Sequence, residues 1–436
     1  MASSLVAVRP RIVEFTAALA CRPLHWMVSA PQFLFSGTLA LMLFRPPNVE
    51  FYSLDRIALG VLIFAILLRS FLLRESLAVV GPVTWPMFGL LLLAFAELSI
   101  QPYESANWSL FAAKWAVPFL LYHLAQVALT REQALKHFET FVLIILGYLI
   151  FVSVAFFVGA RGFVFPAFIL DESLGIHADR ARGPFLQAVA NGVSLNILGL
   201  LALDSFRRRR LRGFLAMSFV LTFPIAIVAT KTRAVWLSTG ASLVLLLLAC
   251  HDRRIRLACK CLLLVVTCGF LVAALPVSSD GALSDRIADR SPLDYRAEVY
   301  RAGWDMFLEK PLFGWNTTEI QTELSTRITS FRVETFILHN TYLEIAVEHG
   351  VLGIALYAWL LVDLFRLGRR RLAPAFGLYR GFLDQQFRRL WPLIVLVFVI
   401  NACFVVMNYQ FVSGLLFTLA GILAAQNRRY ALEEHS

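Results

Sequence analysis

Runs of about twenty mainly apolar residues recur along almost the whole chain, and they constrain its fold more than any other feature. A helix of that length crosses the ~30 Å hydrocarbon core of a bilayer and satisfies its own backbone hydrogen bonds there. The sequence therefore predicts an all-α integral membrane protein with about twelve transmembrane helices. The predicted helices begin near Trp26, Leu54, Leu77, Leu110, Phe141, Gln187, Gly213, Thr232, Leu257, Leu343, Leu390 and Phe411.

The basic residues predict which way the chain crosses the membrane. Only 16% of the residues are charged, yet the formal charge is +11, because Lys and Arg residues gather in alternate short loops. Such loops are cytoplasmic by the positive-inside rule, so both termini are predicted in the cytoplasm and nucleic-acid binding is disfavoured. The clusters are Arg69 and Arg74; Arg131 and Lys136; Arg207–Arg210 with Arg212; Arg253, Arg254, Arg256 and Lys260; Arg366, Arg369–Arg371, Arg380, Arg388 and Arg389; and Arg428 and Arg429.

One long loop, 277–338, lies on the exported side between the predicted ninth and tenth spans. It contains ten acidic and seven basic residues, so its basic residues are not a topogenic cluster. We expect residues 1–436 to form a single polytopic domain, with this loop as a partly helical periplasmic subdomain and 366–389 as a basic cytoplasmic loop. Apolar residues at near-helical spacing predict one amphipathic helix in the long loop, and they are Tyr295, Val299, Ala302 and Met306.

His339 is the strongest candidate for acid–base chemistry. It precedes a predicted helix, at which Thr341 and Glu344 have the spacing of a capping box and Asn340 supports the cap. A helix start offers free N–H groups and a partial positive charge, so a histidine there lies beside an anion site. The alternative interpretation is that His339 is an ordinary polar residue of a loop. Of eight histidines, however, only His177 and His339 fall in predicted exported loops.

Several cations on the exported side are not explained by topology. Lys231 and Arg233 lie at the mouth of a span, Arg296 lies in the long loop, and Arg180 and Arg182 close the middle loop. Snorkelling to lipid phosphate or a surface salt bridge would explain any one of them. Arginine can also bind phosphate oxygens two at a time, so Arg233 with Lys231 is interpreted as a candidate phosphate clamp, and Arg296, Arg180 and Arg182 are further candidates.

Other features narrow the chemistry further. Lys114 lies about one turn inside its span, where an ionisable residue is functional by default unless it snorkels outward. The sequence contains no Walker loop, HExxH motif, CxxC pair or Ser nucleophile elbow. No Asp-x-Asp pair stands in an exported loop. We therefore expect no nucleotide hydrolysis, no metal and no cofactor.

Three motifs resemble the O-antigen ligase family, within the wider superfamily of O-antigen ligases, O-antigen polymerases and related oligosaccharyltransferases. The first is Thr232-Arg233 at a span entrance, and the second is R-x-x-x-Y followed by L-F-G-W, from Arg296 to Trp315. The third and most specific is H-N-x-Y-L…E-x-G-x-x-G, from His339 to Gly353. The chain departs from the pattern at Trp315-Asn316, where a second glycine is expected after Gly314.

The resemblance implies a GT-C-like, metal-independent inverting glycosyltransferase of lipopolysaccharide biosynthesis. Its donor would be O-antigen polysaccharide on undecaprenyl diphosphate, and its acceptor lipid A-core oligosaccharide, at the periplasmic face of a bacterial inner membrane. On this interpretation His339 is the general base. The diphosphate-binding residues would be Arg233, Arg296, Arg182, Arg180 and Lys231.

Three alternative functions remain at this point. An O-antigen or capsule polymerase uses the same donor with a second carrier-linked chain as acceptor. A flippase or transporter of lipid-linked glycan also has about twelve helices, but transporters usually place ionisable residues near the bilayer midplane. A scaffold would need no arginines at exported span ends.

Overall fold

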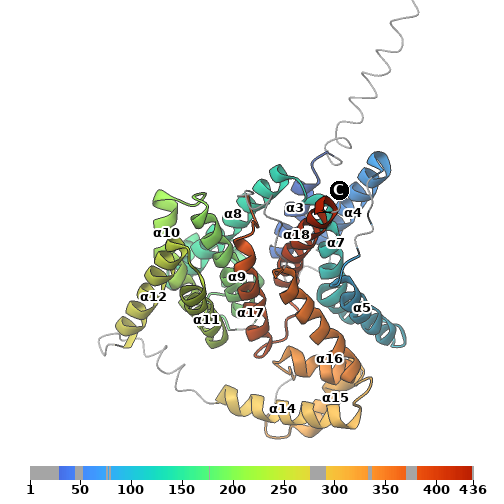
Figure 1. Cartoon of the computed structure of the whole chain (residues 1–436). Helices are drawn as coiled ribbons and strands as arrows, with labels where there is room; N and C mark the ends of the chain where they lie inside the picture. The colour runs from blue at the N-terminus through green and yellow to red at the C-terminus, as the bar shows by residue number, and fades with distance from the viewer. Residues whose placement is uncertain are drawn as a thin grey trace, which may run out of the picture.

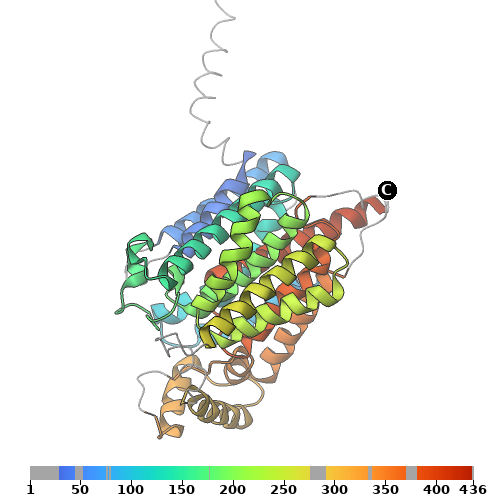
Figure 2. The same cartoon turned by 90° about the vertical axis from the view of Figure 1, so that its left-hand side faces the viewer.

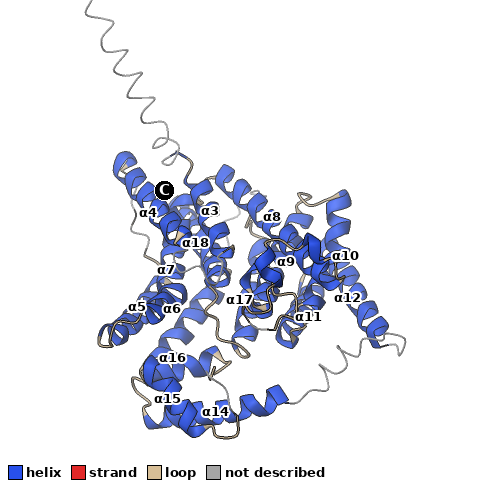
Figure 3. Ribbon diagram, turned by 180° about the vertical axis from the view of Figure 1, so that it is seen from behind, coloured by secondary structure: helices blue, strands red, loops and turns tan. Residues whose placement is uncertain are grey.

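The computed structural model describes residues 29–44, 53–74, 77, 80–175, 177–274, 291–331, 336–369 and 381–434. Helices, turns and loops make up these residues, which include no β-strand (Figures 1 and 3). The helices are α3 (Pro31–Leu43), α4 (Leu54–Leu73), α5 (Thr84–Ser99), α6 (Ser105–Phe111), η1 (Ala112–Ala116), α7 (Val117–Ala128), α8 (Glu132–Phe157), α9 (Ala188–Arg207), α10 (Gly213–Ala229), α11 (Arg233–Ala249), α12 (Arg253–Ala274), α14 (Ser291–Glu309), α15 (Thr317–Arg327), α16 (Thr341–Leu367), α17 (Trp391–Ala402) and α18 (Gln410–Glu434).

Six helical segments are long and apolar enough to cross a membrane among the described residues. The prediction of an all-helical, multi-pass membrane protein is confirmed at this level, and the count of twelve spans stays a prediction. Shorter or more polar helices lie at the other predicted positions, and Trp26 lies outside the described residues. The six segments are Leu54–Leu73, Ser105–Ala128, Glu132–Phe157, Ala188–Arg207, Thr341–Leu367 and Gln410–Arg428.

Helix α9 lies at the centre of the bundle, where it packs against α8, α10, α11, α12 and α17 (Figure 1). Two of its buried asparagine side chains bind residues of other helices. The Asn191 Nδ2 donates to Ser153 Oγ at 2.9 Å, and Asn196 Nδ2 donates to Ser238 Oγ at 3.1 Å. Hydrogen bonds between helices replace the water that these amides would otherwise bind, so α9 can carry them at membrane depth.

Two consecutive arginines at the end of α9 pair with acidic residues from distant parts of the sequence at one end of the bundle. Arg207 Nη2 lies 2.6 Å from both Asp204 Oδ1 and Asp384 Oδ1, and Arg208 Nη2 lies 2.6 Å from Glu139 Oε1. The end of α9, the start of α8 and the segment before α17 therefore meet on the same side. In the predicted basic loop 366–389, residues 370–380 lie outside the described residues.

Helices α14 and α15 lie at the opposite end, beyond the start of α16 (Figures 1 and 2). They share a small apolar core of their own, separate from that of the bundle. The helix predicted around Tyr295 to Met306 corresponds to α14. The preceding part of the long loop, 277–290, is not among the described residues. The core is formed by Val299, Ala302, Met306, Trp315, Ile320, Leu324, Ile328, Phe336, Leu338 and Val347.

A break in α16 joins this subdomain to the bundle. Gly350 has φ 61° and ψ −157°, which no helical residue adopts, so the backbone groups on either side of it need new partners. The segment 311–315 supplies them. Val351 N–H donates to Pro311 O at 2.8 Å, and Trp315 N–H donates to Val347 O at 2.7 Å.

The glycine at the tip of this segment is required by the close approach of the two backbones. Gly314 has φ 76°, and a Cβ there would lie 2.4 Å from the carbonyl oxygens of Val347 and Glu348. The following Trp315 fits where the family pattern suggested glycine, since its indole Nε1 donates to Met306 O at 2.7 Å. The joint therefore depends on Gly314, and Trp315 adds a bond to α14.

We expect Gly314→Ala to separate α14 and α15 from the bundle. The matched control is Gly159→Ala, because Gly159 has the same φ of 76° but nothing within 4 Å of the added Cβ. Both variants cost about 1–2 kcal/mol of left-handed strain, whereas only Gly314→Ala adds a clash with backbone. The melting temperature of the purified protein should fall further for Gly314→Ala, with faster proteolysis between α14 and α15. Equal melting temperatures for the two variants would contradict this account of the joint.

Candidate functional site

His339 lies immediately before α16, as predicted, in an unusual backbone conformation. Its φ is 50°, in the left-handed region, and its side chain is half-buried. The next residue, Asn340, is the N-cap, and its side-chain oxygen accepts from Tyr342 N–H at 2.9 Å and Leu343 N–H at 3.2 Å. The cap therefore begins one residue earlier than a Thr341 capping box would place it.

The predicted capping box itself is wrong, because both of its side chains have other partners. Thr341 Oγ1 donates to Val405 O at 2.8 Å and accepts from Met407 N–H at 3.0 Å, which ties α16 to the connection between α17 and α18. Glu344 Oε2 lies 3.0 Å from Lys114 Nζ of η1. Both residues still support the first turn of α16, through tertiary contacts.

Helix α14 places an aromatic wall and a cation beside His339. Tyr300 Oη donates to His339 O at 3.0 Å, and the Tyr295 ring packs edge-on against the imidazole at a centroid distance of 6.1 Å. Burial, the positive charge of Arg296 and the nearby His177 together lower the pKa of His339 to about 4. The imidazole is therefore neutral at pH 7 and can accept a proton.

A second group of cations lies on the middle loop and at the start of α11. Arg180 Nε and Lys231 Nζ each lie 3.8 Å from the carboxylate of Asp179, and Arg180 Nη2 lies 3.1 Å from His177 Nδ1. His177 also influences the pKa of His339. It therefore connects this group to the one around His339 and Arg296.

The remaining two predicted residues have different surroundings. Arg233 is the first residue of α11, two positions after Lys231, and its side chain is exposed. Arg182 is only 1% exposed, and its guanidinium donates to the carbonyl oxygens of Leu174, Ile169 and Asp171. These bonds hold the middle loop together, so the Arg182 side chain is directed into its own loop.

The arrangement combines a neutral proton acceptor with several cations at one end of the bundle. The three sequence motifs do not include His177, although it is one of the two histidines in predicted exported loops. Tyr300 was contained in the R-x-x-x-Y motif without a role. Within the described ranges, no group of three or more His, Cys, Asp or Glu residues is arranged to hold a metal ion.

Comparison with known families identifies one matching region of the chain. Residues 217–358 match a family model described as O-antigen ligase. The matched residues run from α10 into α16 and include Lys231, Arg233, Arg296 and His339. The resemblance predicted from the motifs is thus confirmed. No curated protein matches the chain.

The His339 environment predicts an unusual titration. We expect the midpoint near the lowered pKa of about 4, and a rise toward the ordinary value of about 6.5 in Arg296→Gln, because removing a positive charge favours the protonated imidazole. Carbethoxylation of His339, followed by mass spectrometry across pH, measures the neutral fraction. A wild-type midpoint above about 6, or no change in Arg296→Gln, would contradict the assigned environment.

Proposed function

Because residues 217–358 carry an O-antigen ligase domain, we propose that this membrane protein transfers O-antigen polysaccharide from undecaprenyl diphosphate to lipid A-core oligosaccharide. The family match supports a glycosyltransferase-like enzyme that uses a lipid-linked polysaccharide. The observation that carries the finer proposal is the neutral, half-buried His339 beside Arg296, at one end of the helical bundle.

His339 acts as the general base in this proposal. Its imidazole takes the proton from the acceptor hydroxyl while that oxygen attacks the anomeric carbon of the donor sugar. The bond from that carbon to the diphosphate oxygen breaks on the opposite face, so the configuration is inverted. The proton then leaves the imidazolium for water, and base catalysis of this kind contributes about 10²–10⁴-fold.

The diphosphate leaving group is stabilised by cations, and the reaction requires no metal. Arg296 and Arg233 provide guanidinium forks that match phosphate oxygens, with Lys231 and Arg180 as additional charges. Asp179 lies 3.8 Å from both Arg180 and Lys231, which is beyond hydrogen-bonding distance, so phosphate oxygens can compete for these two cations. We leave Arg182 out of the phosphate group, because its donors bind loop carbonyls.

We propose that the site faces the periplasm of a bacterial inner membrane, in a GT-C-like protein with twelve spans and both termini in the cytoplasm. The basic network of Arg207 and Arg208 supports this orientation, because it lies at the end of the bundle opposite His339. A diphosphate in the membrane surface would also raise the pKa of His339, since a nearby anion favours the imidazolium. Donor binding would thereby strengthen the base.

A polymerase of the same superfamily would use the same donor, so the acceptor must be tested directly. Purified protein is given carrier-linked glycan together with lipid A-core. Polymer attached to the core supports the ligase, and longer carrier-linked chains support the polymerase. Counterflow of intact carrier-linked glycan in proteoliposomes, with no covalent product, would instead support a transporter.

His339→Gln should lower turnover by about 10²–10⁴-fold, because the base is lost while the polar shape is kept. Binding of the carrier-linked donor should change little. His251→Gln is the matched control, since His251 is exposed at the start of the α12 region and far from α14 in the chain. Normal lipopolysaccharide ladders from cells that contain only the His339 variant would exclude this role.

Arg296→Lys tests the bidentate contact, because it retains the charge and loses the planar fork. The loss of one charge-assisted hydrogen bond, about 1.5–3 kcal/mol, should lower kcat/KM about tenfold or more. Arg301→Lys, at an exposed position of the same helix, should have no comparable effect. If the two variants transfer glycan equally well, Arg296 does not bind the diphosphate through its fork.

A further inference from the structure

A lysine is buried inside the bundle close to the start of α16. Lys114 belongs to η1, a π-helical turn between α6 and α7, and its side chain is only 6% exposed. A π-turn adds a residue to the helical ladder, and such turns are frequent at functional sites. The sequence allowed Lys114 to snorkel outward, but the structure directs it inward.

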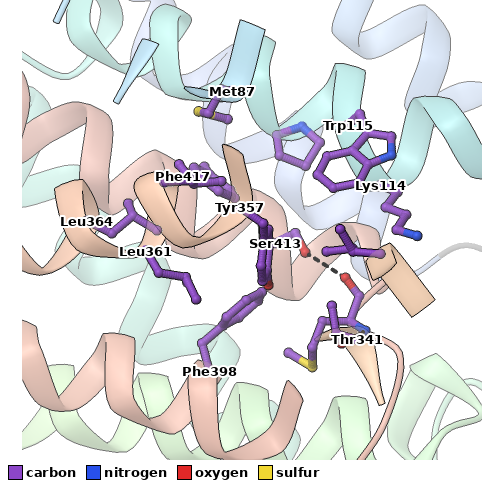
Figure 4. Close-up of a pocket in the computed structure, with 14 residues that line it drawn as sticks. Met87, Lys114, Trp115, Thr341, Tyr357, Leu361, Leu364, Phe398, Ser413 and Phe417 are labelled. Carbon is purple, nitrogen blue, oxygen red and sulfur yellow. Dashed lines mark hydrogen bonds between the residues drawn. The ribbon is translucent and has the colours of Figure 1, made fainter. Parts of the chain in front are cut away.

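The Lys114 ammonium is held by two carboxylates on successive turns of α16. Its Nζ lies 3.0 Å from Glu344 Oε2 and 2.7 Å from Glu348 Oε2. Figure 4 shows Lys114 and Trp115 at a pocket that is also lined by Tyr357, Phe398 and Phe417. The pocket has a volume of about 30 Å³. The residues that line this cavity are largely apolar. The two carboxylates are therefore the groups that compensate the positive charge of the Lys114 ammonium.

The ionisable cluster continues toward α5. His349 Nδ1 lies 2.7 Å from Glu97 Oε2, and His349 Nε2 lies 3.7 Å from Glu348 Oε2. A second cavity, of about 40 Å³, borders Glu97, Lys114, Glu348 and His349. Its volume accommodates water but no substrate-sized ligand. We therefore interpret the cluster as part of the structure that holds α16, rather than as a second binding site.

Lys114 is the one permanent positive charge in this cluster of described side chains. Three carboxylates, Glu97, Glu344 and Glu348, surround it and His349. Loss of the lysine would leave these carboxylates with only the imidazole to balance them. A buried ion pair that loses one partner is strongly destabilising, because the other charge stays in a poorly solvated site.

The first part of α16 is a short helix that needs such external contacts. Gly350 interrupts α16, so residues 341–349 are separated from the long membrane-spanning part. A helix of this length is not stable by itself, and its position is set by tertiary packing. Glu344 lies in its first turn, and the N–H of Glu344 donates to Asn340 O at 2.9 Å. His339 directly precedes that cap.

We propose that Lys114 is a positioning residue for the reaction, which holds the short helix 341–349 through Glu344 and Glu348 and thereby fixes His339 relative to Arg296. This inference rests on the proposed function of His339 as the base. Thr341 and the 311–315 segment hold the same short helix from α17, α18 and the subdomain. Lys114 connects it to the α5–α7 side of the bundle, together with the pair formed by His349 and Glu97.

The test compares Lys114→Met with Lys136→Met in the full-length purified protein. Lys136 pairs with Glu132 at 2.7 Å, on an exposed face at the start of α8, so the control also loses a Lys–Glu pair. Lys114→Met should lower kcat up to about 10²-fold, as expected for a small misplacement of the base, with KM for donor and acceptor nearly unchanged. Lys136→Met should match the wild type.

A third variant separates positioning from stability. Lys114→Met combined with Glu344→Gln and Glu348→Gln removes the uncompensated charge, so the melting temperature should recover. The contact between residue 114 and the short helix 341–349 is still absent, so kcat should remain low. Recovery of both kcat and melting temperature would overturn the proposal, because Lys114 would then act only by compensating buried charge.

Carbethoxylation of His339 provides a readout that does not depend on glycan transfer. The carbethoxylation rate of His339 should differ from the wild-type rate in Lys114→Met and in the triple variant. It should equal the wild-type rate in Lys136→Met. If wild-type protein transfers no glycan but the His339 rate changes in this way, the proposed function fails and the positioning role stands. If Lys114→Met alters neither the His339 rate nor kcat, the positioning role fails.

Discussion

The break at Gly350 creates a requirement that the α14–α15 end of the protein must satisfy. Helices suit a membrane because every interior backbone group has a partner within the same segment, and one non-helical residue interrupts that pattern. The Pro311 carbonyl and the Trp315 N–H restore the lost bonds at 2.8 and 2.7 Å. The subdomain of α14 and α15 is therefore joined to α16 by backbone contacts, which place Tyr300 and Arg296 beside His339.

The features that local sequence determines were predicted well. Long apolar runs gave the helical class, and His339 was placed before a helix that does begin at Thr341. The cap was misassigned because Asn340 and Thr341 are both good cap formers, and spacing alone does not choose between them. The bonds of Thr341 to Val405 and Met407 decide the matter, and they join residues more than sixty positions apart.

Residues that looked alike in the sequence were separated by tertiary structure. Arg180 and Arg182 occupy alternate positions of one loop, yet Arg180 contacts His177 and Asp179 while Arg182 binds three carbonyls of its own loop. Lys114 was equally ambiguous, because nothing nearby in the chain indicates Glu344 and Glu348 as its partners. Such choices depend on which helices become neighbours, and a single sequence does not give that information.

The paired arginines at the other end of the bundle have a consequence for how the protein is made. Arg207 and Arg208 are needed early if they help to orient α9 during insertion, when only the first part of the chain has been synthesised. The pairing of Arg207 with Asp384 is possible only after α16 has been synthesised, since Asp384 follows α16 in the chain. The same Arg207 side chain would thus first help to direct α9 and later fasten it to the segment that precedes α17.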